Sequence, residues 1–535
     1  MVSAVLFITF FVLLVLNVPI AVCLGLSSAA AILYSGTSLT IVATNIYSGI
    51  SKFLLLAIPF FVLSGNIMAK AGISTRLIRF VDTCVGHRKG GIANVCIIVA
   101  CFFGAISGSG PATVAALGAV LIPAMVERGG FSAAFSTALM ATSSSIAIVI
   151  PPSIAFVVYA SITGVSIGDM FMAGIIPGIL MGLALVVVVM LEVRRNHVVP
   201  SNVEKASAKE RWNAFKDAFW GFLMPVIILG GIYGGIFTPT EAAAVSVVYG
   251  LFVGMVIYKE VKFKDLWEIL IDSAKTTGGI MLIVACASLF SFVCTRFGIS
   301  TAASELLARV AGNQFTFLLI CNIIFLIAGC FIDANSAMYI FIPILLPVCK
   351  ALGFNVIAFG IMATVNLAIG QVTPPVGVNL FVAIGIKLRD GIRVTLQEIS
   401  RAVVPMVAAS IAVLLIITYI PQISTCLPAA LGSAAAIEND ETVGGDGGTT
   451  QTDNDDFNTI GDYSDLDWAD MTWNFTCSTT ETSTWAQAGR KFGDLMEQAT
   501  GGKVKGDVYA ADQLTGGNQS EGIQALMNGD PVQIS

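Results

Sequence analysis

Two polar segments interrupt long apolar stretches of this chain and place oxygen-bearing groups where lipid would supply no partner for them. The first runs from Gly104 to Thr113 and the second from Gly329 to Ala337. Unwound backbone in such segments leaves free carbonyls, which are hard oxygen ligands suited to Na⁺, and helix N-termini, which attract carboxylates. The side chains that could join this chemistry at the two tips are Ser107, Ser109, Thr113, Asp333, Asn335 and Ser336.

Each tip is followed by an apolar run and then by a second break that contains two successive prolines. The first break reads Ile150-Pro-Pro-Ser153 and the second reads Thr373-Pro-Pro-Val-Gly377. Matched interruptions in two halves of an apolar chain are typical of a secondary transporter site. The offset between the halves is nearly constant along this region, since it pairs Pro123 with Pro347, Gly130 with Gly353, Thr142 with Thr364 and Pro151 with Pro374.

A break in an apolar helix, or a polar residue inside the apolar part of the chain, can also have a purely structural explanation. Any single break could simply kink a packed helix, but four breaks in two matched pairs favour a site. Asp333 can be interpreted in two ways. It is either a functional group at membrane depth or the cap of a helix that begins near Asn335. Glu241 is interpreted as structural, because Thr238-Pro-Thr-Glu241 has the pattern of a capping box with proline at the first helical position.

The composition predicts an all-α polytopic membrane protein. Hydrophobic residues make up 56% of the 535 residues, charged residues make up 12%, and the mean hydropathy is +0.86. These values exclude an ordinary soluble domain. Almost all of residues 1–422 lies in apolar runs able to cross or dip into a hydrocarbon core of ~30 Å. Because the first run lacks a basic start, it predicts a retained membrane helix rather than a signal peptide.

The charges divide the chain into a basic body and an acidic tail. Residues 1–436 carry 24 Lys/Arg and 16 Asp/Glu, a balance of +8, whereas residues 437–535 carry 4 and 18, a balance of −14. From Glu438 to Asp470 there are eleven carboxylates and no Lys or Arg. Such a segment buries too little apolar area to order itself, which predicts a disordered linker.

Basic residues predict the orientation of the body. Arg88 and Lys89 precede the first arm (residues 92–106) and Arg128 follows the return arm (residues 114–125). Both arms are short for a crossing, so they predict a re-entrant hairpin that opens to the cytoplasm. Few basic residues flank the second hairpin, as expected if it belongs to an inverted repeat and opens to the other side of the membrane. The predicted domains are a first membrane repeat (1–191), a cytoplasmic connector (192–218), a second membrane repeat (219–431), the acidic linker (432–471) and a segment outside the membrane (472–535).

An intramembrane enzyme is the competing class. The turn Gly108-Ser109-Gly110 has the form of a serine nucleophile turn, but such a serine needs a nearby base. The only histidines, His87 and His197, lie in basic loops, and Asp333 has no second intramembrane aspartate placed to pair with it. The sequence therefore predicts a protein without catalytic residues.

Five motifs spread over the body together resemble one family. Residues 1 to about 431 are similar to the large membrane subunit of a TRAP transporter, the tripartite ATP-independent periplasmic class. No single motif is specific, but the set is. The motifs are Leu56-Ala-Ile-Pro-Phe-Phe-Val-Leu-Ser-Gly-Asn66, Ser107-Gly-Ser-Gly-Pro-Ala-Thr-Val-Ala-Ala-Leu-Gly118, Ala173-Gly-Ile-Ile-Pro-Gly178, Gly235-Ile-Phe-Thr-Pro-Thr-Glu-Ala242 and Thr373-Pro-Pro-Val-Gly-Val-Asn-Leu-Phe381.

The resemblance implies Na⁺-driven uptake of an organic acid anion, such as a C4-dicarboxylate or sialic acid, across the bacterial inner membrane by an elevator mechanism. It also implies a small four-helix membrane subunit and a periplasmic substrate-binding protein as partners, with no nucleic acid and no metal other than Na⁺. An elevator-type anion transporter that needs no binding protein stays the alternative. The implied second Na⁺ site comprises Gly329, Gly370, Thr373 and Val376; the repeat offset suggests Gly104, Ser144 and Ile150 for the first, and Ser153 joins the tip residues as a substrate contact.

The tail resembles a second part of the same system. Trp485–Lys505 and Tyr509–Leu514 are similar to the N-terminal portion of the family's periplasmic substrate-binding protein. The pattern predicts a strand at 474–475, a helix at 485–499, a strand at 503–509 and a helix at 522–528, a partial α/β fold. The segment ends before the region that carries the family's carboxylate-binding arginine, so it is not expected to bind substrate alone.

Overall fold

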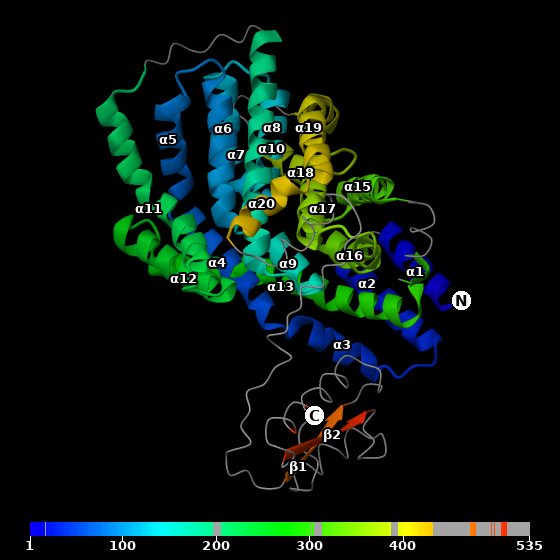
Figure 1. Ribbon diagram of the computed structural model, residues 1–535. Helices are drawn as coiled ribbons and strands as arrows, with labels where there is room; N and C mark the ends of the chain where they lie inside the picture. Colours follow the sequence, from blue (N-terminus) through cyan, green and yellow to red (C-terminus); the bar gives the residue numbers. More distant parts are fainter. Residues whose placement is uncertain are drawn as a thin grey trace, which may run out of the picture. The chain divides into compact units, whose positions relative to one another are not determined.

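The computed structural model describes residues 1–16, 18–195, 205–299, 301–303, 313–386 and 394–431, together with 471–477, 494, 497 and 504–510. The chain divides into two compact units, Met1–Gly444 and Gly445–Ser535. Helices make up the regular structure of the first unit in its described residues, and both strands belong to the second (Figure 1).

The first unit consists of apolar helices whose lengths suit a membrane. Nine of its described helical segments are long and apolar enough to cross a membrane by length and composition. In chain order the elements are α1 (Val2–Val15), α2 (Ile20–Tyr34), α3 (Thr40–Ile50), η1 (Phe53–Leu56), α4 (Ala57–Lys70), α5 (Ile73–Val85), α6 (Gly91–Ser107), α7 (Gly110–Glu127), α8 (Ala133–Ser145), η2 (Ile146–Ile148), α9 (Ile154–Thr163), α10 (Ile167–Arg195), α11 (Ala208–Tyr233), α12 (Pro239–Phe252), η3 (Val253–Ile257), α13 (Phe263–Arg296), α15 (Gln314–Phe331), α16 (Ala334–Ala351), α17 (Val356–Gly370), α18 (Val378–Ile384), α19 (Leu396–Tyr419) and α20 (Gln422–Ala430).

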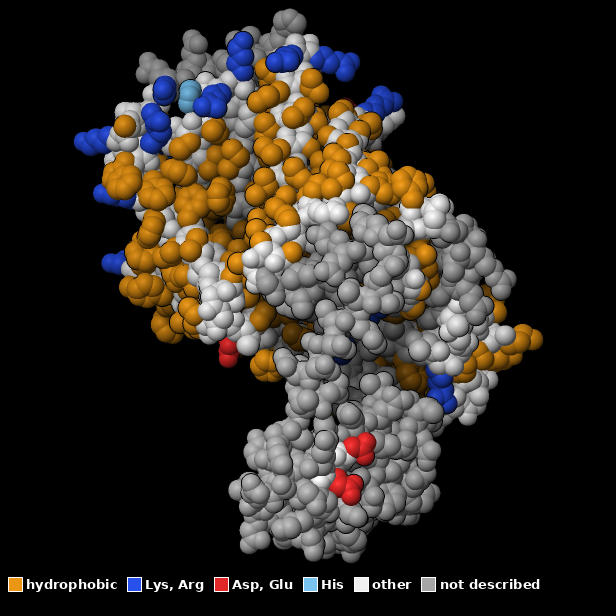
Figure 2. Space-filling view, viewed as in Figure 1, with side chains coloured by type: hydrophobic (Ala, Val, Ile, Leu, Met, Phe, Trp, Pro, Cys, Tyr) orange, Lys and Arg blue, Asp and Glu red, His pale blue; other side chains and the backbone are white. Residues whose placement is uncertain are grey.

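The surface of this unit is apolar where lipid would contact it. Figure 2 shows Lys and Arg gathered at the upper end of this unit and a broad area of apolar side chains directly below them. Leu183, Val226 and Val248 each expose more than half of their side-chain surface. So large an exposed apolar area indicates a membrane-embedded body rather than a water-facing one.

Two helical hairpins lie at equivalent positions of the two halves. Helices α6 and α7 form the first and α15 and α16 form the second. The return arms correspond closely, because α7 spans 110–127 and α16 spans 334–351, which is the same shift at both ends. The duplication predicted from sequence is therefore visible in helix boundaries.

The first tip is shorter than the sequence analysis predicts. The return arm was expected to begin at Val114, but α7 begins at Gly110, so Thr113 lies in its first turn. Pro111 explains the difference: proline suits the first turn of a helix because its missing N–H would have no partner there.

A second break follows each hairpin. Helix α8 passes into the short 3₁₀ turn η2 and ends before the diproline at 151–152, after which α9 begins. Helix α17 ends at Gly370, and α18 begins at Val378 beyond the diproline at 374–375. Both diprolines are cis. The described chain thus has the four interruptions that the sequence predicts.

The centre of the first unit lies around α8 and α17. Every residue from Ile357 to Gly370 is buried, as is every residue from Phe135 to Ser145. Both helices are apolar or small-residue on all sides, which is typical of helices enclosed by others. They carry the second breaks, so the breaks start from the most enclosed part of the protein.

The second unit contains two parallel strands, β1 (Met471–Cys477) and β2 (Val504–Ala510), paired from Met471 with Val504 to Cys477 with Ala510. Both predicted strands are present: β1 extends past the predicted range at each end, and β2 nearly coincides with it. Positions 494 and 497 of the first predicted helix are helical. The rest of that helix, the second predicted helix and the linker 432–470 lie outside the described residues, so the binding-protein resemblance stays a prediction.

Candidate functional site

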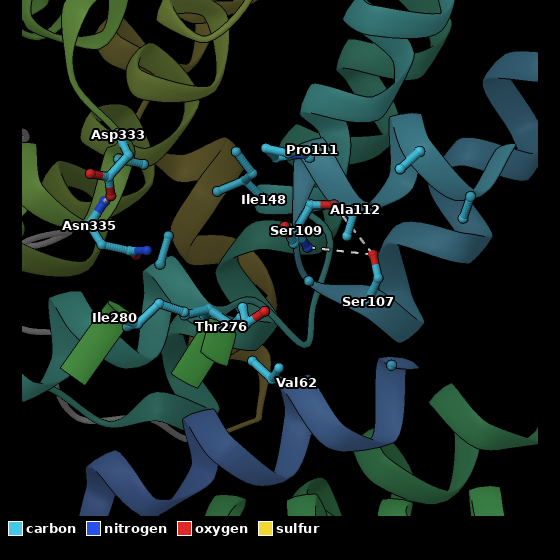
Figure 3. Close-up of a pocket in the computed structure, with 18 of the residues that line it drawn as sticks. Val62, Ser107, Ser109, Pro111, Ala112, Ile148, Thr276, Ile280, Asp333 and Asn335 are labelled. Carbon is cyan, nitrogen blue, oxygen red and sulfur yellow. Dashed lines mark hydrogen bonds between the residues drawn. The ribbon is translucent and has the colours of Figure 1, made fainter. Parts of the chain in front are cut away.

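A cavity of about 570 Å³ lies between the two hairpin tips. Figure 3 shows Asp333 and Asn335 on one side of it and Ser109 and Pro111 on the other. Its volume is within the ~300–1,000 Å³ that small-molecule sites usually have. The remaining walls come from α4, η2, α9, α13 and the end of α17 through Val62, Gly65, Asn66, Ala69, Ile148, Ile154, Ala155, Thr276, Ile280 and Gln371.

The first tip is held by hydroxyl groups. The Ser107 and Thr113 hydroxyls lie 2.9 Å apart, and the Thr113 hydroxyl donates to the Ser109 carbonyl at 2.8 Å. Gly108 makes the turn with φ of +60°, a left-handed conformation that glycine adopts without strain. Ser107 and Ser109 line the cavity, whereas Thr113 is fully buried behind them.

The second tip is held by Asp333. Its carboxylate accepts hydrogen bonds from the Asn335 and Ser336 backbone amides, at 3.0 and 3.2 Å, and from the Ser336 hydroxyl. The aspartate therefore caps α16, which begins at Ala334. Asp333 also lines the cavity, so the same side chain both caps α16 and faces the candidate site.

In each half, the hairpin packs against the helix that leads to the second break so closely that their backbones nearly touch. A Cβ added to Gly104 would lie 2.6 Å from Ala147 Cα, and one added to Gly370 would lie 2.5 Å from Gly329 Cα. These contacts bring the backbones of a hairpin and a broken helix together at two related places, and at the second place the Gly329 and Leu367 carbonyl oxygens lie at the contact. Such carbonyls are suitable ligands for a small hard cation.

The second breaks are held mainly by their own backbone. The Ser144 hydroxyl donates to the Ala141 carbonyl at 2.7 Å, and the Thr373 hydroxyl donates to the Ile369 carbonyl at 2.8 Å. The Ser153 hydroxyl donates to the Ile148 carbonyl. These hydroxyls are occupied as donors, but their oxygens keep a lone pair for a further partner.

The structure sorts the predicted site residues into three groups. The cavity brings together Ser107, Ser109, Asp333 and Asn335. Thr113, Ser153 and Ser336 are buried beside it and support its walls. The residues predicted for Na⁺ do not line the cavity: Gly104, Ser144, Gly329 and Gly370 are buried between helices, and Ile150, Thr373 and Val376 are half-buried.

Sequence reasoning missed several polar residues of the cavity. Gln371 lies in the second break, and Asn66 and Thr276 come from α4 and α13. The Asn66 side-chain amide donates to the Ser273 hydroxyl at 2.8 Å, which joins those two helices. The available signal for Gln371 was its place in the second break, two residues before the predicted Thr373.

The electrostatics of the cavity are unusual for an anion site. Among its described lining residues, Asp333 is the only ionisable side chain. An anion there has no Lys, Arg or His of the lining set as a partner. Its charge would have to be balanced by helix N-termini and by bound cations.

The fold defines a class, the polytopic helical membrane proteins with paired hairpins and broken helices. Among solved structures, the YdaH transporter of Alcanivorax borkumensis has a similar fold: it aligns with a TM-score of 0.52 and 14% identity over 73% of this chain and 88% of that one.

The particular family comes from the sequence comparisons. Residues 7–423 match the family described as "Tripartite ATP-independent periplasmic transporter, DctM component", and the chain belongs to this family. The family is one of transporter permeases. Membership of this tripartite periplasmic transporter family implies a small membrane subunit and a periplasmic binding protein as partners.

Relatives with named substrates differ from one another. The chain is 39% identical to the C4-dicarboxylate TRAP large permease of Rhodobacter capsulatus, over 78% of this chain and 97% of that protein. It is 41% identical to the isethionate TRAP permease of Oleidesulfovibrio alaskensis, over 78% and 65%. It is 35% identical to the sialic acid TRAP large permease of Vibrio cholerae, over 75% and 92%. The family match ends before the tail.

Proposed function

We propose that this protein is the Na⁺-coupled large permease of a TRAP transporter and takes up an organic acid anion into a bacterial cell across the inner membrane. The observation that carries this proposal is the cavity between the two tips, whose one ionisable side chain among the described lining residues is Asp333. An anion beside a carboxylate in a low-dielectric site is unfavourable unless cations accompany it. Coupling to Na⁺ supplies those cations and the driving force.

The two Na⁺ ions would bind where hairpin and broken helix meet. In the second half the ligands would be carbonyls near Gly329 and Gly370, with Thr373 and Val376. In the first half they would be carbonyls near Gly104 and Ile150, with Ser144. Ions at both places would fix each hairpin against its broken helix, so Na⁺ binding would shape the cavity before the anion arrives.

Transport would follow an elevator mechanism. The hairpins, the broken helices, α10, α19 and α20 would move as a body against a frame of α1–α5 and α11–α13. One contact across that boundary is the hydrogen bond from Lys52 Nζ to the Ser161 carbonyl of α9, at 2.7 Å. Such a polar contact can break and re-form at low cost, which suits a boundary that slides.

The acidic tail, residues 432–535, would lie on the periplasmic side.

Proteoliposome uptake tests the function directly. The permease is reconstituted with its small membrane subunit, and uptake of radiolabelled carboxylates is measured with and without an inward Na⁺ gradient and added binding protein. Uptake that needs both supports the proposal. Uptake unaffected by the Na⁺ gradient would contradict the coupling, and uptake without binding protein would favour the binding-protein-independent alternative.

A further inference from the structure

The repeat extends into the frame, where its two copies have different shapes. Helix α3 begins at Thr40 and α13 begins at Phe263, the same shift that relates the two diprolines. Under this shift the chain from α3 through η1 to α4 corresponds to α13. The first copy is broken, because Lys52 is extended, with φ of −73° and ψ of 126°, and the 3₁₀ turn η1 follows it. The second copy is one continuous helix of 34 residues.

The part of α13 that corresponds to the turn η1 is poorly suited to a helix. It comprises residues 276–279, which read Thr-Thr-Gly-Gly. The Thr276 hydroxyl donates to the Asp272 carbonyl at 2.9 Å, a side-chain bond of the kind that weakens and bends helices. Glycine favours a helix less than any residue except proline. A Cβ added to Gly278 or Gly279 would meet nothing within 4 Å, so close packing explains neither glycine.

The two copies also pack differently against the moving body. In the first half η1 packs against α9, and α4 packs against α6. The repeat counterparts of α6 and α9 are α15 and α18, but α13 packs mainly against α16 of that body. The two halves therefore have different arrangements in one structure. In a transporter built from inverted repeats, we expect each half to adopt the arrangement of the other in the opposite state.

Lys52 holds the contact of the first half. Its Nζ donates at 2.7 Å to the Ser161 carbonyl, which lies in the last turn of α9. The Val165 amide, four residues further on, donates to the Thr163 hydroxyl at 3.5 Å. Carbonyls in the last turn of a helix lack helical partners and attract cations. The lysine therefore fixes the broken frame segment to the end of α9.

Lys275 is the repeat counterpart of Lys52. Its ammonium lies 3.6 Å from the Asp272 carboxylate one turn earlier, and both side chains expose more than half of their surface. An exposed pair of this kind contributes little, so Lys275 can leave it at low cost. The shift that pairs the two lysines also pairs Ser161 with Ile384, which ends α18. The carbonyl of Ile384 is thus an acceptor of the same kind as that of Ser161.

We propose that Lys275 is a positioning residue for the opposite state of the transport cycle. In that state α13 breaks at residues 276–279, as the first copy is broken at Lys52, and the Lys275 ammonium donates to the Ile384 carbonyl. The bond between Lys52 and Ser161 is then open. The two lysines hold the two end states in turn, and the two glycines keep the cost of breaking α13 low. This inference rests on the proposed elevator movement and names the residues that hold its end points.

Side-specific labelling tests the two lysines. In a background with the native cysteines replaced, Ala112→Cys places a thiol in the cavity wall, and a membrane-impermeant maleimide is added to one side of uniformly oriented proteoliposomes. We expect Lys52→Gln to change the labelling rate about threefold in one direction and Lys275→Gln to change it about threefold in the other, because each variant removes the contact of one state. Lys52→Arg and Lys275→Arg keep the charge and a donor, so they should label near the parent rate. Shifts in the same direction, or no shift in Lys275→Gln, would overturn the inference.

The glycines test the breaking of α13. Gly278→Ala/Gly279→Ala fills open space and strengthens the helix, so the apparent melting temperature should rise while Na⁺-driven uptake slows about tenfold. The matched control is Gly230→Ala in α11, where an added Cβ also meets nothing within 4 Å and uptake should be unchanged. Uptake at the parent rate in the double variant would overturn the inference. Loss of the small membrane subunit from the purified double variant would overturn it as well, because the glycines would then be a packing site for that partner. A parent permease without Na⁺-driven uptake would count against the proposed function itself.

Discussion

Gly329 and Gly370 touch backbone to backbone: a Cβ on Gly370 would lie 2.5 Å from both the Cα and the carbonyl carbon of Gly329. No side chain fits between the second hairpin and the broken helix at this point. Both glycines have ordinary helical neighbours, so close approach rather than backbone conformation explains their presence. The contact lies where we propose the second Na⁺ ion.

Gly370→Ala should separate these helices. Overpacking at a tight contact typically costs about 1–3 kcal/mol, and the displaced carbonyls would no longer meet around a cation. We expect the Na⁺ concentration for half-maximal uptake to rise about tenfold. The control is Gly230→Ala in α11, where an added Cβ meets nothing within 4 Å. Unchanged Na⁺ dependence in Gly370→Ala would argue that the ion binds elsewhere.

Thr373 tests the same site through a side chain. Its hydroxyl donates to the Ile369 carbonyl at 2.8 Å and keeps a lone pair for a cation. Thr373→Ala should raise the half-maximal Na⁺ concentration about tenfold, whereas Thr373→Ser keeps the hydroxyl and should stay near the parent value. Uptake measured over a range of Na⁺ concentrations gives both numbers. If the alanine and serine variants behaved alike, the hydroxyl would have no part in ion binding.

The sequence predicts well where the helices are interrupted, but it predicts poorly which residues enclose the cavity. Glycines and diprolines mark where helices end, and the constant offset gives the pairing of the two halves. The Thr238–Glu241 capping box is also confirmed, because it depends only on local spacing. In contrast, Asn66 and Thr276 reach the cavity through the packing of α4 and α13 around the tips. No local pattern carries that information, since it depends on contacts between residues far apart in the chain.

A buried amide pair that no motif indicates joins α15 to α17. The Asn366 side-chain amide donates to Asn322 Oδ1 at 2.7 Å and to its carbonyl at 3.0 Å, and Asn322 donates to the Thr418 hydroxyl at 3.3 Å. Both asparagines are at most 5% exposed. The pair lies one to two turns before Gly329 and Gly370, so it fixes the same two helices.

Replacing one asparagine of this pair should lower the stability of the protein more than replacing both. Asn366→Leu leaves the Asn322 oxygen buried without its donor, a penalty of about 1–3 kcal/mol, whereas replacing both partners by apolar side chains can be nearly neutral. We expect the apparent melting temperature in detergent to fall clearly in Asn366→Leu and to recover partly in Asn366→Leu/Asn322→Leu. Additive losses in the double variant would show that the two amides do not act as a pair.

The contact between Lys52 and Ser161 tests the proposed movement. Lys52 precedes η1 in the frame, and Ser161 lies in α9 of the moving body, where its hydroxyl is also 2.9 Å from that of Tyr339 in α16. In a background with the native cysteines replaced, a bifunctional methanethiosulfonate reagent long enough to span the length of a lysine side chain would link Lys52→Cys to Ser161→Cys and join frame to body through bonds that a reductant cleaves. We expect cross-linking to stop uptake and a reductant to restore it. The matched control, Ser161→Cys with Tyr339→Cys, links two helices of the same body and should transport while cross-linked. Full uptake by the cross-linked Lys52–Ser161 pair would mean that α9 does not move against η1, because a closed cross-link forbids the sliding that an elevator needs.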